Sequence, residues 1–142
     1  EERLLGSGDG VMPRWSPNGH RIVFQTRLGT NAEMDIMTMP SDGGEPEPVL
    51  TDEATDWSPT WSPDGRFIYF ISDRGGSMNL WRIPVDEESG RPSGEPEPVT
   101  TPATFAAHPS FSADGRRVAF SSVLMRQNLQ IAEFDPQSFV MS

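Results

Sequence analysis

The sequence contains no cysteine and no lysine, so all 11 of its basic side chains are arginines. Without cysteine the chain forms neither disulfides nor thiolate metal sites. It also lacks an apolar run of 18 residues, and no segment is therefore expected to insert into a membrane as a helix. No stretch keeps apolar residues at helical spacing for three turns without a Gly or a Pro, which excludes a helical repeat. Because the chain begins at Glu1, we interpret it as a processed product or an excised piece.

Positive charge is scarce, since 21 acidic residues face 11 basic ones and the net charge is −10. A protein that binds phosphate backbones or anionic lipid usually presents a basic face. Neither nucleic acid nor a membrane is therefore an expected partner. In contrast, 13 glycines and 14 prolines are present. No collagen-like period accounts for them, and they predict many turns between short elements.

One motif recurs three times, at Pro13 to Gly19, Pro59 to Gly65 and Pro109 to Gly115. Each copy ends in Asn-Gly or Asp-Gly, a strong hairpin signal because both residues tolerate a positive φ. β-branched and aromatic residues follow each copy, as in buried strands. They predict strands at 21–25, 66–71 and 117–121, and second strands at 35–39, 79–83 and 128–132.

A period of about 40–50 residues with four short strands is typical of a β-propeller blade. We therefore predict an all-β fold, a β-propeller segment of three four-stranded blades at 11–51, 57–101 and 107–142. Residues 1–6 are expected to form an outer strand of a preceding blade. The Glu-Pro-Glu-Pro stretches lead into outer strands at 49–51 and 99–101, because Pro cannot sit in a central strand. Segment 139–141 is an alternative outer strand for the third blade.

Aromatic residues occupy equivalent places in the repeats and are expected to pack between blades. They are Trp15, Trp61 and Phe111 in the motif, and Phe24, Phe70 and Phe120 in the strand that follows.

The run from Trp61 to Gly76, which continues into Asn79-Leu80-Trp81, closely resembles the repeat of TolB-type, WD40-like β-propellers. The first copy has Asn18 in place of the usual Asp, and the third has Phe111 for Trp and Ala113 for Pro. The resemblance implies a six-bladed ring, of which this chain is half. It also implies that a protein or a small ligand binds on one rim, in a periplasmic or extracellular setting. Because the same repeat accompanies peptidases, kinases and regulators, it identifies the fold better than the function.

The loops between blades and those between the two middle strands are expected on one rim, opposite the Asn-Gly and Asp-Gly turns. They differ among the three repeats in length and composition, as a binding rim does. The candidate binding residues there are Arg27, Asp56, Trp57, Arg74, Phe105, His108 and Arg126. The arginines would recognise carboxylates of a partner, or else pair with the acidic loop at 52–56. The aromatics would be binding hot spots, or else pack against the neighbouring blade. His108 would act as a proton switch, or else only form hydrogen bonds within its loop.

We predict a non-catalytic binding module with no cofactor and no metal. The sequence lacks a Gly-x-Ser-x-Gly elbow, and its two histidines, His20 and His108, are expected on opposite rims. The alternatives are a sensor or scaffold segment of a larger fused protein and, less favoured, a propeller hydrolase. Half a ring exposes two apolar blade faces, so a homodimer that closes the six-bladed ring is predicted. In it, residues 3–5 of each copy would complete the other's third blade.

Overall fold

The computed structural model describes residues 10–27, 34–100, 105–123, 134–135 and 140–141, and every regular element in them is a β-strand. The first antiparallel sheet contains, in chain order, β1 (Val11–Trp15), β2 (Arg21–Thr26), β3 (Asp35–Pro40) and β4 (Glu47–Leu50). The second contains β5 (Asp56–Trp61), β6 (Phe67–Ser72), β7 (Asn79–Pro84) and β8 (Glu97–Pro98). Two antiparallel pairs follow, β9 (Phe105–Phe111) with β10 (Val118–Val123), and β11 (Phe134–Asp135) with β12 (Val140–Met141).

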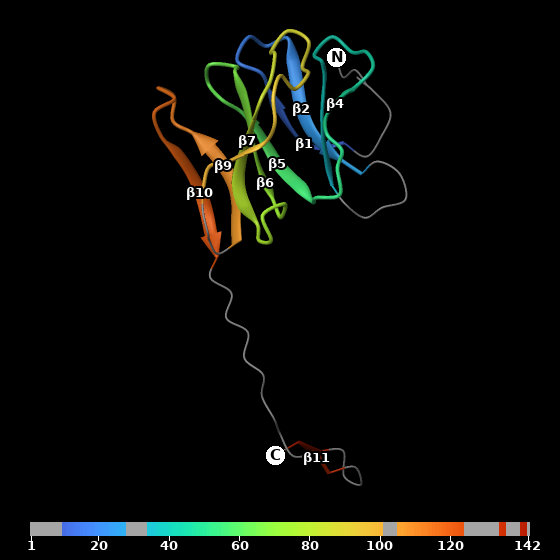
Figure 1. Ribbon diagram of the computed structural model, residues 1–142, viewed down its shortest axis with the longest axis vertical. Helices are drawn as coiled ribbons and strands as arrows, with labels where there is room; N and C mark the ends of the chain where they lie inside the picture. Colours follow the sequence, from blue (N-terminus) through green and yellow to red (C-terminus); the bar gives the residue numbers. More distant parts are fainter. Residues whose placement is uncertain (1–9, 28–33, 101–104, 124–133, 136–139, 142) are drawn as a thin grey trace.

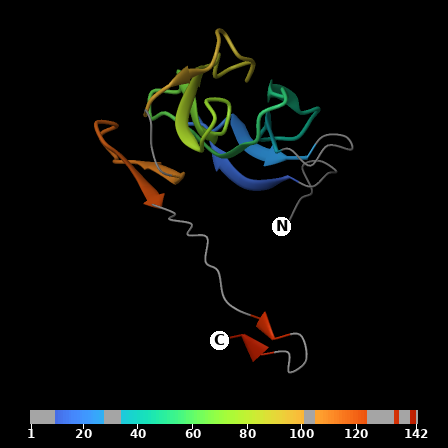
Figure 2. The same cartoon turned by 60° about the horizontal axis from the view of Figure 1, so that its bottom comes forward.

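The sheets lie side by side in chain order, the first in blue to teal, the second in green to yellow and the β9–β10 pair in orange (Figures 1 and 2). The first strands of the three units are neighbours, because β1 contacts β5 and β5 contacts β9. These strands therefore line the axis around which the blades turn. The predicted all-β propeller fold with four-stranded antiparallel blades is confirmed.

Some of the expected strands lie outside the described residues, namely those at 1–6 and 128–132. In the tail, β12 pairs with β11 rather than with the third blade. The described residues contain no helix of the length and apolarity that a membrane crossing requires.

The three repeated turns share one geometry. Only the glycines have a positive φ, 77° at Gly19, 71° at Gly65 and 68° at Gly115. The Asn or Asp before each Gly instead caps the turn, as where Ser62 Oγ donates to Asp64 Oδ1 at 2.6 Å. In the first two copies the Pro at the start of the turn fixes its own φ near −65° and favours an ordinary type I turn, and Ala113 takes that position in the third.

The hydrophobic core lies between the first two blades. It contains Val23, Ile36, Val49 and Leu50 from the first blade and Trp61, Ile68, Phe70, Ile83 and Val85 from the second. Trp61 is 5% exposed and Phe70 is fully buried, so the predicted packing between blades is confirmed for this pair.

The same prediction was wrong for Trp15, which is 64% exposed, and for Phe120, which is 38% exposed. Trp15 pairs with Ile22, and Ile22 lies on the opposite face of the sheet from Val23, the residue that contacts the second blade. Trp15 thus stands on a face against which no described blade packs. Phe120 lies on β10 of the third blade. The described residues supply only two strands beside the second blade here, β9 and β10.

The loop at 86–93, which follows β7 and has no counterpart of this length in the first repeat, folds back onto the first blade. Arg21 Nη1 donates to the carbonyl of Glu88 at 3.2 Å, and Thr38 Oγ1 donates to the carbonyl of Gly90 at 2.9 Å. An ion pair of 3.0 Å joins Arg91 to Glu47 of β4. The loop therefore ties two neighbouring blades together at the rim that carries the Asn-Gly and Asp-Gly turns.

Candidate binding rim and axial cavity

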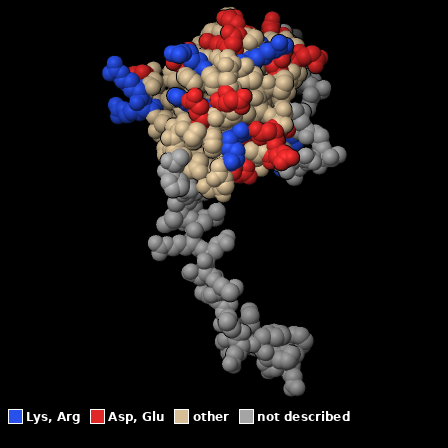
Figure 3. All heavy atoms as spheres, in the orientation of Figure 1, with Lys and Arg blue, Asp and Glu red and all other residues tan. Residues whose placement is uncertain are grey.

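Among the described residues, two of the loops that the sequence assigns to one rim, at 52–58 and 73–78, meet there. The backbone N–H of Asp56 donates to the carbonyl of Met34, at the start of β3, at 2.8 Å. The backbone N–H of Thr55 donates to Asp73 Oδ1, in the loop after β6, at 2.9 Å. The loop before β5 is therefore held against the start of β3 in the first blade and the loop after β6 in the second. On the face that Figure 3 shows, acidic side chains are spread with basic ones beside several of them.

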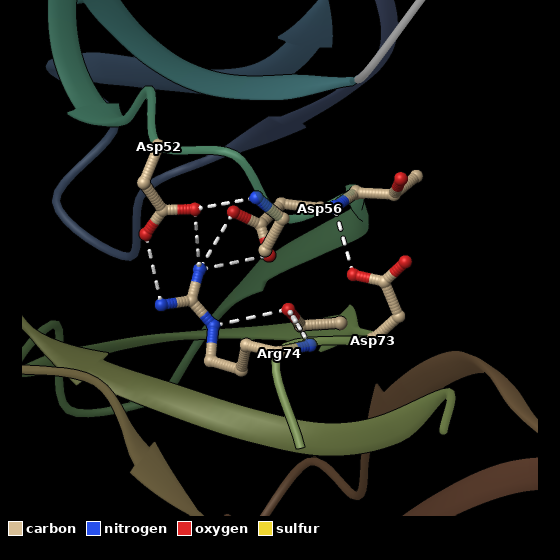
Figure 4. A network of polar contacts seen from close by, with 7 residues as sticks. Asp52, Asp56, Asp73 and Arg74 are labelled. Atoms are coloured by element: carbon tan, nitrogen blue, oxygen red, sulfur yellow. Dashed lines mark hydrogen bonds and ion pairs between the residues drawn. The ribbon is translucent and has the colours of Figure 1, made fainter. Parts of the chain in front are cut away.

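Arg74 is the centre of a polar network on this rim (Figure 4). Its Nη2 donates to both carboxylate oxygens of Asp56, at 3.0 and 2.8 Å, and its Nη1 donates to Asp52 Oδ2 at 3.0 Å. Its Nε donates to Ser72 Oγ at 3.0 Å. The guanidinium also lies 5.4 Å from the ring centre of Phe70, a cation–π distance. Arg74 is only 14% exposed, so its charge is satisfied within the chain by the acidic loop.

Asp56 is the buried member of this network, with a side chain that is 1% exposed. Burial raises its pKa from 3.8 to about 6, while hydrogen bonds from Ser72 and Arg74 act in the opposite direction. The carboxylate is therefore charged at neutral pH and takes up a proton under mildly acidic conditions.

A second cluster lies where the three axial strands begin. Met12, Ser58 and His108 occupy the same position of the repeat and have φ values of 55°, 53° and 53°. These are the positive-φ residues other than Gly in the described chain. At each of them the strand pairing shifts its register, as it does between Trp57 and Thr60. Gln25 fixes one of these bulges, because its Oε1 accepts the backbone N–H of Ser58 at 2.7 Å.

The bulges bring three side chains together at the axis. Ser58 Oγ lies 3.8 Å from Met12 Sδ and 3.5 Å from His108 Nδ1. Trp57 packs edge-on to the His108 ring, with 5.8 Å between ring centres. An open cavity of about 490 Å³, which we call the axial cavity, runs along these strands. Its lining is Met12, Arg14, Ser58, Pro59, Thr60, Trp61, His108, Pro109, Ser110 and Phe111.

The seven predicted site residues fall into distinct environments. Asp56 and Arg74 pair with each other, and Trp57 and His108 form the axial contact. Arg27 is exposed and directly follows β2. Phe105 begins β9 and pairs with Val123 through the backbone. Arg126 lies outside the described residues.

Trp57 is partly buried and packs against the cluster of Ile71, Leu80 and Ala106, between the second and third blades. Of the two roles that the sequence left open for Trp57, the structure therefore shows packing against the neighbouring blade.

Sequence reasoning overlooked Met12, Arg14 and Ser58. The repeat phase could have found them, because Met12 and Ser58 align with His108, and Arg14 aligns with Thr60 and Ser110. Among the described residues, no three His, Cys, Asp or Glu side chains are grouped as a metal ion would require.

Comparison with known proteins agrees with this geometry. A family model described as the TolB beta propeller domain matches residues 5–141. An uncharacterized protein of Agrobacterium fabrum is 38% identical over 76 residues, which are 53% of this chain and 25% of that protein. The Tol-Pal system protein TolB of an Anaeromyxobacter species is 32% identical over 74 residues, which are 49% of this chain and 17% of its own length. The chain thus spans a quarter or less of these relatives.

Solved structures share the architecture. A TolB-like protein of Agrobacterium tumefaciens superposes on 99% of this chain and 50% of its own, with a TM-score of 0.76 and 26% identity. TolB from Acinetobacter baumannii superposes on 94% of this chain and 31% of its own, with a TM-score of 0.65 and 23% identity. A puromycin-hydrolyzing peptidase of Mycobacterium tuberculosis has a TM-score of 0.64 and covers 99% of this chain and 23% of its own. At 16% identity, the likeness to the peptidase concerns the fold alone.

Proposed function

Since this chain belongs to the TolB β-propeller domain family, we propose that it is a non-catalytic binding module that presents a protein- or ligand-binding rim. The observation that carries the proposal is the axial cluster of Trp57, Ser58 and His108. His108 is exposed, is held in a backbone conformation that non-Gly residues rarely adopt, and lies beside a cavity. Such conformations persist where the surrounding structure holds them, and they gather at binding sites.

The described part of the rim is preorganised for binding. The Arg74 network holds the loop at 52–56 against the loop after β6, so a partner would find this part of the rim already ordered. A preformed surface loses little conformational entropy on association, which favours affinity. Among the predicted residues whose side chains the structure describes, Arg27 and His108 are exposed.

A hydrolase is the second candidate, because Ser58 Oγ lies 3.5 Å from His108 Nδ1. A Ser-His pair acts as a nucleophile when a third group orients the imidazole. In the part of the chain that the structure describes, no carboxylate is hydrogen-bonded to His108, and the Ser58 residue is only 5% exposed. Binding is therefore the better-supported function. Failure of a fluorophosphonate probe to label Ser58 would agree with it.

The chain covers 50% of the TolB-like structure with which it superposes, which agrees with half of the six-bladed ring that the family resemblance implies. We propose that a second copy supplies it, in a homodimer with residues 3–5 of each copy added to the other's third blade. Trp15 supports this, because the equivalent Trp61 is 5% exposed where a blade covers it and Trp15 is 64% exposed where none does. The alternative is a longer protein that contains the remaining blades beside a sensor or scaffold region. We propose a periplasmic or extracellular location for either form, and the family resemblance supports it.

Photo-crosslinking tests the rim. A benzophenone amino acid at position 27 or 108 should capture a partner from a periplasmic or secreted extract. The same amino acid at position 114, an exposed residue in a turn of the opposite rim, serves as the control. Equal capture from both rims, or capture at position 114 alone, would contradict the proposed rim.

A further inference from the structure

The axial cavity differs in charge from the rest of the molecule. The whole chain has a net charge of −10, yet none of the described residues that line the cavity is acidic. The lining instead holds one guanidinium, Arg14, together with the imidazole of His108 and the hydroxyls of Ser58, Thr60 and Ser110. At physiological ionic strength the Debye length is about 8 Å, so carboxylates elsewhere on the surface are largely screened from a group inside the cavity. The local lining therefore decides which charge the cavity accepts.

Arg14 differs from the arginines that have carboxylate partners in this chain. Arg74, Arg82 and Arg91 each form an ion pair of 2.8 to 3.0 Å with a carboxylate. The described hydrogen bond of Arg14 runs from its Nη1 to the carbonyl of Pro13, at 2.9 Å. A guanidinium has five N–H donors, so the others are open to an acceptor that enters the cavity.

The side chains that line the cavity form two levels along the axis. Met12, Ser58 and His108 make one level, and Arg14, Thr60 and Ser110, two residues further along the same strands, make the next. An arginine fork fits the two oxygens of a carboxylate, and hydroxyl donors can complete the hydrogen bonding of such a group. Because the levels come from three different blades, a ligand here would contact all three at once.

We propose that the axial cavity is a binding site for a carboxylate group, which Arg14 holds through its guanidinium while Ser58 and His108 contact the ligand from the neighbouring level. The carboxylate site rests on the proposed function, because it names the chemical class of ligand that the proposed binding rim would bind at its axis. A free carboxylic acid and a carboxylate side chain of a protein share this chemistry.

Nuclear magnetic resonance gives a readout at the site itself, because the chain has only two histidines. His108 lies in the axial cavity, and His20 follows a turn on the opposite rim and serves as an internal control. The free acid is represented by glutarate, with neutral glutaramide as its matched analogue. The protein-borne carboxylate is represented by acetyl-Gly-Glu-Gly-amide, with acetyl-Gly-Gln-Gly-amide as its analogue. All titrations use the full chain at constant pH and ionic strength.

The proposal expects the ring Hε1 signal of His108 to move with at least one charged probe while that of His20 stays in place. Arg14→Gln should weaken the apparent affinity about tenfold or more, as expected for loss of a charged hydrogen bond. Arg116→Gln removes the same charge from an exposed turn on the other rim and should leave the affinity unchanged. Equal shifts with the neutral analogues, no shift at His108, or full affinity in Arg14→Gln would overturn the carboxylate site. If partner crosslinking at the rim persists in that case, the proposed function stands without it.

Discussion

Asp56 lies beneath Arg74 with a side chain that is 1% exposed, and Nη2 of Arg74 donates to both of its carboxylate oxygens. The pair joins the start of an axial strand to the loop between the two middle strands of the same blade. The sequence alone left two roles open for Arg74, recognition of a partner's carboxylate and pairing with the acidic loop at 52–56. The structure shows the internal ion pair.

Removal of Arg74 should be costly for this reason. We expect Arg74→Gln to lower the free energy of unfolding at pH 7 by about 3–5 kcal/mol, because it leaves a buried charge without its partner. Arg82→Gln is the matched control, since it breaks an exposed pair with Glu97 and should cost less than about 1 kcal/mol. Urea denaturation of both variants makes the comparison, and equal losses would show that the Asp56 pair is no stronger than a surface pair.

The raised pKa of Asp56 predicts a pH dependence with a definite sign. A carboxyl whose folded pKa is about 6 and whose unfolded pKa is 3.8 binds its proton more tightly in the folded state. The contribution of Asp56 to the free energy of unfolding is therefore fully present below pH 3.8 and is lost as the pH rises through 6. The whole change is about 3 kcal/mol. Asp56→Asn should remove this component. Denaturation from pH 4.5 to 7.5 measures it as the difference between the wild-type and variant slopes, and parallel slopes would reject the raised pKa.

The loop at 86–93 predicts an effect of Gly90 on stability. Gly90 has a φ of 72°, and a Cβ there would collide with the Arg21 and Thr38 side chains of the first blade. Gly76 has a φ of 88° and open space around it, so Gly76→Ala measures the backbone strain alone, about 1–2 kcal/mol. Gly90→Ala should lose more than this. Thermal unfolding that ranks the two variants equally would mean that the loop is not held tightly between the blades.

Two tryptophans four residues apart should respond differently to truncation. Trp61→Ala should cost about 3–5 kcal/mol, because Trp61 fills the core between the first two blades. Trp57→Ala should cost less, since Trp57 is only partly buried. Chemical denaturation gives the order, and the reverse order would contradict the assignment of Trp61 to the core.

The repeat made the fold predictable. Three copies of the Trp-Ser-Pro-Asp-Gly type of motif determine where each hairpin turns, and the strands on either side follow from their composition. The exposure of Trp15 was not predictable in this way, because its local sequence matches that of Trp61. The presence or absence of a neighbouring blade decides burial, and local sequence does not encode that neighbour.

The site was less predictable than the fold. Arg74 lies in a loop and pairs with two carboxylates, those of Asp52 and Asp56. Arg14 lies on β1, and its described hydrogen bond goes to the carbonyl of Pro13. Partner choice depends on how the loops at 52–56 and 73–76 meet, which is a tertiary property. The bulges at Met12, Ser58 and His108 could not be predicted from a glycine in the sequence, because non-Gly residues adopt the positive φ there.

Light scattering of the purified chain at micromolar concentration tests most directly whether a second copy completes the ring. We expect a monodisperse particle of twice the chain mass of 15.7 kDa. We also expect that Trp15→Ala shifts the equilibrium toward single chains, because it removes an apolar side chain from the face that the partner covers. A monodisperse particle of 15.7 kDa at the same concentration, with Trp15→Ala indistinguishable from wild type, would contradict the homodimer.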